Sequence, residues 1–89
     1  MIKEITLNNL GTVNKNEVVI TTDKETFYLS FSYQTLVGIS YYGHKAVIQN
    51  YWSTTTGKLL NDLEPDHKAR LTDKEFKKEV DKMMKLINS

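Results

Sequence analysis

The chain has 89 residues and a net charge of +1, with 39% apolar and 26% charged residues. This length fits one domain, residues 1–89, and the near-neutral charge excludes a general attraction to nucleic acid or acidic membranes. Cysteine is absent, which excludes disulfides, thiol catalysis and thiolate metal sites.

The first half of the chain, residues 1–51, consists mainly of predicted strands. Residues 2–7 and 17–22 are rich in β-branched side chains, and residues 26–33 alternate between apolar and polar types. One face of this third strand carries Phe27, Leu29, Phe31 and Tyr33. Residues 36–41 and 45–50 follow, joined by a turn at Gly43. We therefore expect about five short antiparallel strands connected as a meander.

Four small hydroxyl residues stand where these strands give way to a short helix, predicted over residues 53–64. Such side chains favour the start of a helix, because they hydrogen-bond the free N–H groups of its first turn. We interpret the cluster as a helix start and Trp52 as an anchor of the junction; the cluster consists of Ser53, Thr54, Thr55 and Thr56. The alternative is that these hydroxyls form a contact site.

The longest predicted helix spans residues 72–88. Thr72 and Glu75 have the spacing of a capping box. An apolar stripe follows at helical spacing, formed by Phe76, Val80, Met83, Met84 and Ile87. We expect the stripe to cover the sheet, which predicts an α+β fold: a small antiparallel sheet packed against a C-terminal amphipathic helix, with a short helix before it.

Two stretches, SYQTLVGI at residues 32–39 and YWSTTTGKLLN at residues 51–61, carry a resemblance to a known family. They resemble small uncharacterised proteins of bacteriophages and mobile elements of Gram-positive bacteria. The matching residues, within 13–63, are Ser32, Tyr33, Thr35, Trp52, Ser53, Thr55, Thr56, Lys58 and Asn61. Many members have His after the lysine, where this chain has Leu59. The resemblance implies a host-cell context and no assigned activity.

The only dense group of ligand-like side chains lies between the two helices, at Asp62, Glu64, Asp66 and His67. Calcium loops alternate carboxylates in this way, but His67 stands where such a loop needs Gly, and Asp73 where it needs Glu. No phosphate-binding loop, dinucleotide fingerprint or esterase elbow occurs. We therefore expect no metal, no cofactor and no enzymatic activity.

Two groups of residues are candidates for contacts. The turn with Tyr41, Tyr42, His44 and Lys45 combines aromatic and cationic side chains, which suit protein binding. The alternative is that Tyr41 belongs to the core. On the last helix, Lys78, Lys82 and Lys85 form a stripe that could contact phosphates.

We expect a non-enzymatic accessory protein of a phage or mobile element that binds and modulates a host or phage protein, with bacterial defence as one context. Its expected location is the cytoplasm of the host cell, without membrane contact, because no apolar run approaches the roughly 18 residues of a membrane span. The first alternative is a small nucleic-acid-binding regulator that uses the lysine stripe and the Tyr/His/Lys turn. The second is a homodimer formed through the open sheet.

Overall fold

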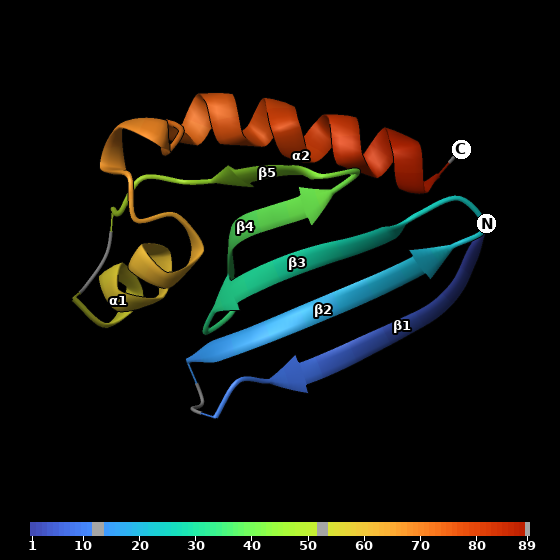
Figure 1. Ribbon diagram of the computed structural model, residues 1–89, viewed down its shortest axis with the longest axis horizontal. Coiled ribbons are helices and arrows are strands. Elements are labelled where there is room, and N and C mark those ends of the chain that lie inside the picture. Colours follow the sequence, from blue (N-terminus) through green and yellow to red (C-terminus); the bar gives the residue numbers. More distant parts are fainter. Residues whose placement is uncertain (12–13, 52–53, 89) are drawn as a thin grey trace.

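The computed structural model describes residues 1–11, 14–51 and 54–88, with side chains in the first helix described from Thr56 onward. Its elements are β1 (Ile2–Asn9), β2 (Lys15–Thr22), β3 (Thr26–Ser32), β4 (Thr35–Tyr41), β5 (His44–Val47), α1 (Thr54–Leu63), the 3-10 helix η1 (His67–Ala69) and α2 (Asp73–Ile87). The strands form one antiparallel sheet in the order β1-β2-β3-β4-β5 (Figure 1). This confirms the predicted α+β fold and the meander. Within the described ranges, no helix is both long enough and apolar enough to cross a membrane.

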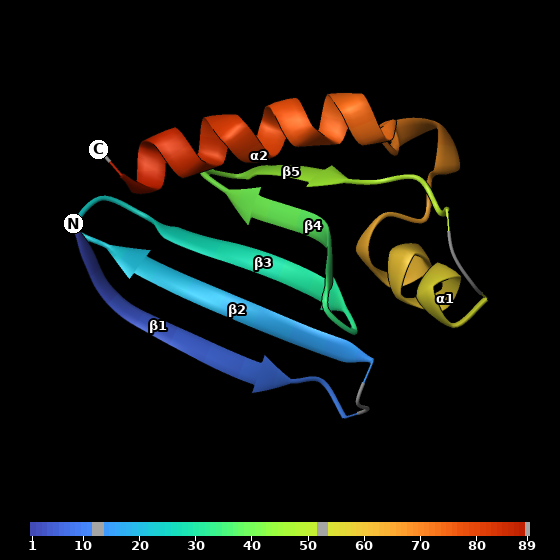
Figure 2. The ribbon, with the colours of Figure 1, turned by 180° about the vertical axis from the view of Figure 1, so that it is seen from behind.

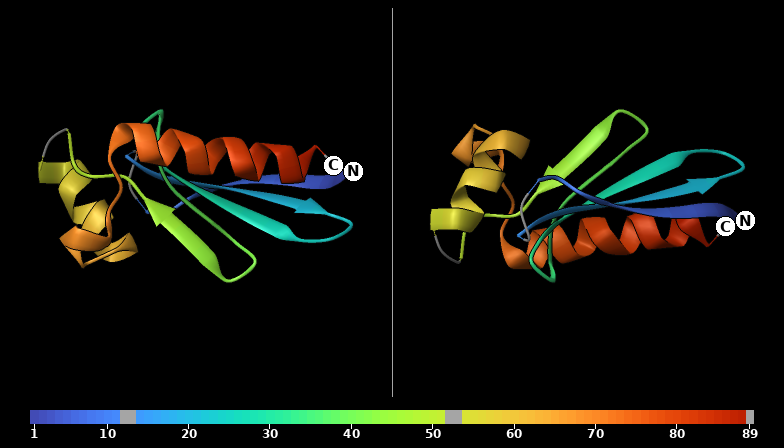
Figure 3. Two further views of the ribbon diagram at one scale, coloured as in Figure 1. Left: turned by 90° about the horizontal axis from the view of Figure 1, so that it is seen from above. Right: turned by 90° about the horizontal axis from the view of Figure 1, so that it is seen from below.

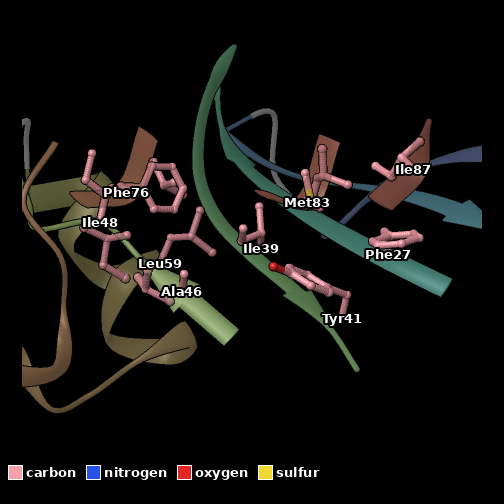
Figure 4. Close-up of a cluster of buried hydrophobic side chains, with 13 residues drawn as sticks. Phe27, Ile39, Tyr41, Ala46, Ile48, Leu59, Phe76, Met83 and Ile87 are labelled. Carbon is pink, nitrogen blue, oxygen red and sulfur yellow. The ribbon is translucent and has the colours of Figure 1, made fainter. Parts of the chain in front are cut away.

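The helix α2 lies along one face of the twisted sheet, and α1 lies at one end of the sheet (Figures 2 and 3). Of the predicted stripe, Phe76, Met83 and Ile87 are buried and Val80 is half-buried, but the prediction is wrong at Met84, which is 43% exposed. The three buried residues join the strand residues Phe27 and Tyr41 in one apolar cluster (Figure 4). Burying this stripe holds α2 in place, since its other side is polar and faces solvent.

The predicted alternation along the third strand holds as far as Phe31 but is wrong at Tyr33. β3 ends at Ser32, and Tyr33 begins the turn to β4 with φ of 54°, leaving its side chain 56% exposed. The turn residues Tyr33 and Gln34 carry none of the glycine or proline that usually indicates a turn. The alternating pattern of the sequence therefore continues to Tyr33, one residue past the end of the strand, with no residue to signal the turn.

Two of the contacts between α1 and the sheet, one apolar and one polar, show how closely the helix approaches the strands. A Cβ atom at Gly38 of β4 would lie 3.1 Å from Leu63 Cδ1, so the absence of a side chain there lets α1 approach the sheet. The Thr56 and Ser32 hydroxyls form a buried hydrogen bond of 2.8 Å. This bond satisfies two buried polar groups that would otherwise destabilise the fold.

The predicted capping box begins α2. Thr72 Oγ1 accepts a hydrogen bond from the Glu75 N–H at 3.3 Å, and Glu75 Oε1 accepts one from the Thr72 N–H at 2.9 Å. Replacing Thr72 by Ala should lower the free energy of unfolding by about 0.5–2 kcal/mol, because one N–H of the first turn loses its acceptor. Urea denaturation at neutral pH measures this difference, and an unchanged midpoint would contradict it.

The same cap should make stability depend on pH. Hydrogen bonds from the backbone and the hydroxyl of Thr72 lower the pKa of Glu75 below its ordinary value of 4.5. A lowered pKa means that the contribution is complete above pH 4.5 and is lost as the pH falls through the folded-state pKa. The matched control is Glu75→Gln, which keeps a capping box but cannot titrate. In this variant the free energy of unfolding should not show the part of the decrease at acid pH that comes from protonation of Glu75.

Candidate functional site

The two tyrosines of the predicted contact turn lie in different environments. Tyr41 is only 8% exposed, and its ring centroid lies 5.5 Å from that of Phe27, so Tyr41 belongs to the core. Tyr42 is 56% exposed and has φ of 50°. Its N–H donates to Glu25 Oε2 at 2.8 Å, which fixes the turn to the end of the neighbouring hairpin. Of these two rings, only that of Tyr42 is exposed and could contact a partner.

The two basic residues of the same turn are each held by a carboxylate. His44 Nε2 lies 3.3 Å from Glu79 of α2. Lys45 Nζ lies 3.5 Å from Glu64 and donates to the Leu63 carbonyl at 3.0 Å. These contacts link β5 to both helices. They also offset the positive charge that a nucleic-acid contact at this turn would need.

The predicted lysine stripe lies on the exposed side of α2, where Lys78, Lys82 and Lys85 all face solvent. Lys82 Nζ lies 3.4 Å from Glu79 Oε1, and the other oxygen of the same carboxylate faces His44. Glu79 therefore stands where the lysine stripe meets the turn, and it lowers the positive charge of both. The nucleic-acid hypothesis stays a prediction that this geometry does not favour.

The hydroxyl cluster lies only partly within the described chain. Trp52 and Ser53 fall outside the described residues, as do the side chains of Thr54 and Thr55. Thr56 is buried, and its hydroxyl forms a hydrogen bond from α1 to Ser32 of β3. The described member of the cluster therefore has a structural contact and is not available to a ligand.

The acidic residues between the helices are engaged separately and do not converge. Asp62 lies 3.5 Å from Lys15, Glu64 faces Lys45, and Asp66 accepts from the Lys68 N–H at the start of η1. In the part of the chain that the structure describes, no group of three or more His, Asp or Glu residues could hold a metal ion.

An apolar surface on β1 was not singled out from the sequence. Leu7 lies opposite Val18, which lies opposite Leu29, then Ile39, so the row shares the face that α2 covers. Exposure rises along this row, from 3% at Ile39 and 8% at Leu29 to 70% at Leu7. On the next row Ile5, opposite Ile20, is 61% exposed. The cover that α2 provides thus ends before β1, and we call Ile5, Leu7, Val18 and Ile20 the open face.

The edge of β1 is open as well. The Leu10 N–H donates to the Lys15 carbonyl at 2.8 Å. Because hydrogen bonding alternates along an antiparallel pair, the backbone groups of Leu7 and Ile5 point away from β2, toward the free edge. At the opposite edge, Leu71 covers the end of β5 and the segment after it: its N–H donates to the Val47 carbonyl, and its carbonyl accepts from the Gln49 N–H, at 2.8 Å each. Open apolar face and open edge therefore coincide at β1.

The sequence does carry a signal for this surface. Ile5 and Leu7 alternate with Glu4, Thr6 and Asn8, which is the period-two pattern of a strand with one apolar face. That pattern predicts that the apolar side chains of β1 are buried, whereas in the part of the chain that the structure describes Ile5 and Leu7 stay 61% and 70% exposed.

Comparison with known proteins places the chain in a family without an assigned activity. Residues 1–80 match the model of a family described as a family of unknown function, DUF8033. No curated protein matches the chain, and no solved structure matches it. The match includes both helices up to Val80, together with the whole sheet.

Proposed function

The chain belongs to the DUF8033 family, and we propose that it is a non-enzymatic binding protein of a phage or mobile element that modulates a host or phage protein. The resemblance of its SYQT and WSTTT stretches to proteins of phages and mobile elements supports an origin in such an element. The observation that carries the binding function is the open face beside the free edge of β1.

An apolar strand at an open edge is suited to bind an extended segment of another protein. The outward backbone groups of Ile5 and Leu7 would pair with the added strand, and alternate side chains of that strand would extend the apolar row. Exposed apolar side chains next to one another commonly mark interaction sites. We infer that the partner contributes an extended segment with apolar residues at every second position.

The register of β1 limits where this segment binds. The pairing with β2 is irregular between Ile2 and Glu4, and such a bulge disrupts the regular presentation of an edge. From Glu4 to Asn9 the pairing is continuous. The segment available for a partner strand is therefore Glu4–Asn9, centred on Ile5 and Leu7.

Leu7→Lys should abolish partner capture while leaving the protein folded, because Leu7 is largely exposed and a lysine there places a charge within the apolar row that the partner must cover. Its matched control, Asn8→Lys, places the same charge on the same strand but on the other face. The measurement is affinity capture from a lysate of a Gram-positive host, quantified by mass spectrometry. We expect a protein enriched by the wild type and by Asn8→Lys, and at least tenfold less of it with Leu7→Lys.

A third variant tests the turn against the open face. Tyr42→Asn removes the exposed ring, and asparagine tolerates the positive φ of this position. If Tyr42→Asn loses the partner and Leu7→Lys still captures it, the assignment of the binding site to β1 is contradicted.

Sedimentation at high micromolar concentration tests whether the protein associates with itself. A wild-type dimer that Leu7→Lys dissociates would identify a second copy as the occupant of the open face, which would overturn the proposal of a different partner protein.

A further inference from the structure

A polar pocket lies between α1, η1 and the segment that follows β5. Its volume is about 560 Å³, and the residues that line it include Asn50, Gly57, Lys58, Asn61, His67 and Arg70. This volume lies within the range of about 300–1,000 Å³ that is usual for small-molecule sites. Two of these residues, Lys58 and Asn61, belong to the stretch that resembles the phage proteins. The pocket is separate from the open face and does not depend on its function.

Two lining residues of the pocket are positively charged. Lys58 comes from α1, and Arg70 follows η1, whose first residue, His67, also lines the pocket. None of the described residues that line the pocket is an Asp or a Glu. The neighbouring carboxylates of Asp62 and Glu64 pair with lysines from the sheet, at 3.5 Å each. The third neighbouring carboxylate, Asp66, accepts from the Lys68 N–H, so within the described residues no carboxylate forms an ion pair with Lys58 or Arg70.

Arg70 is the central residue of this arrangement. It is only 6% exposed, yet within the described residues no carboxylate lies within ion-pairing distance of its guanidinium. Its Nε donates to the Glu64 carbonyl at 3.0 Å, and its Nη2 donates to Asn61 Oδ1 at 2.7 Å. Both acceptors are neutral. A guanidinium has five N–H donors, so these bonds fix its plane and leave three donors for a ligand.

Asn61 adds a further donor. Its Oδ1 accepts from Arg70 and also lies 3.3 Å from His67 Nε2. Because the oxygen accepts from the Arg70 guanidinium, the amide NH2 group is turned away from Arg70 and can donate to a ligand. Gly57 shapes the adjoining wall, since a Cβ atom there would lie 2.9 Å from Asn50 Nδ2. The pocket thus combines cations and neutral donors from three segments of the chain.

We propose that this pocket binds the phosphate group of a small phosphorylated molecule. A phosphate carries close to two negative charges near neutral pH and accepts hydrogen bonds in several directions, which matches Arg70, Lys58 and the Asn61 amide. The planar fork of Arg70 supplies the bidentate contact, and Lys58 supplies a mobile charge at the rim. The remainder of the pocket accommodates the uncharged part of the ligand.

Inorganic phosphate is the probe for the first test. Titration of the ¹⁵N-labelled protein should shift the amide resonances of Gly57, Lys58, Asn61 and Arg70 saturably. Sodium chloride at the same ionic strength should leave these resonances in place. Equal shifts in chloride, or phosphate-induced shifts confined to other parts of the chain, would show a general salt effect and overturn the proposal.

Two lysine variants make the test specific. Lys58→Ala should weaken phosphate binding about tenfold, which is the loss of one charge-assisted hydrogen bond. The matched control is Lys74→Ala on the exposed side of α2, which should bind phosphate as the wild type does. Lys58 is exposed, so its replacement leaves the fold intact. Unchanged affinity in Lys58→Ala, or an equal loss in Lys74→Ala, would exclude the proposed site.

Discussion

Phe27→Ala should lower the free energy of unfolding by about 3–5 kcal/mol, a large part of the total of about 5–15 kcal/mol that a small domain possesses. Phe27 is 1% exposed, and its ring lies at the centre of an aromatic group, 5.5 Å from Tyr41 and 6.4 Å from Tyr42. Alanine would remove this ring beneath α2 and leave a cavity that the rigid sheet cannot close. Denaturation in urea, followed by far-UV circular dichroism, measures the loss.

The adjacent residue provides the control. Tyr28 follows Phe27 on β3 but points to the opposite face and is 43% exposed. Tyr28→Ala removes a comparable aromatic volume and the same β-strand propensity, with less lost burial. We expect a clearly smaller destabilisation than for Phe27→Ala. Equal losses at the two positions would mean that strand propensity, and not burial under α2, determines the stability of β3.

The elements that the sequence predicts correctly are those whose pattern depends on neighbours along the chain. The capping box at Thr72 and Glu75 and the buried positions Phe76, Met83 and Ile87 all arise within one helix, so spacing alone reveals them. The meander follows from short polar connections between alternating strands, which leave sequential strands side by side.

The features that the sequence does not reveal depend on contacts between distant segments. Leu7 is exposed because α2 covers the sheet over β3 to β5 and does not reach β1. The spacing of residues within β1 contains no information about how far α2 reaches. The environment of Arg70 likewise requires Asn61 and Glu64 to be brought to it by the turn after α1. An isolated arginine in a polar stretch gives no sign of burial.

Leu60→Ala should lower the free energy of unfolding by about 2–5 kcal/mol. Leu60 is fully buried, at 0% exposure, and together with Leu59 and Leu63 it holds α1 against the end of the sheet. The ten-residue helix is too short to be stable alone, so its order depends on this packing. Leu7→Ala is the matched control: the same side chain is removed from a largely exposed position and should cost less than about 0.5 kcal/mol.

The same substitution tests whether α1 belongs to the cooperative unit that includes the sheet. If it does, Leu60→Ala should lower the urea midpoint of the sheet and accelerate hydrogen exchange in α1 and in β3 alike, because one transition exposes both. Phosphate binding should fall with it, since α1 carries Lys58 and Asn61. Fast exchange confined to residues 56–63, with β3 as protected as in the wild type, would instead make α1 an independently opening segment. The buried bond between Thr56 and Ser32 argues for the cooperative result, because opening α1 alone would leave the Ser32 hydroxyl without that partner.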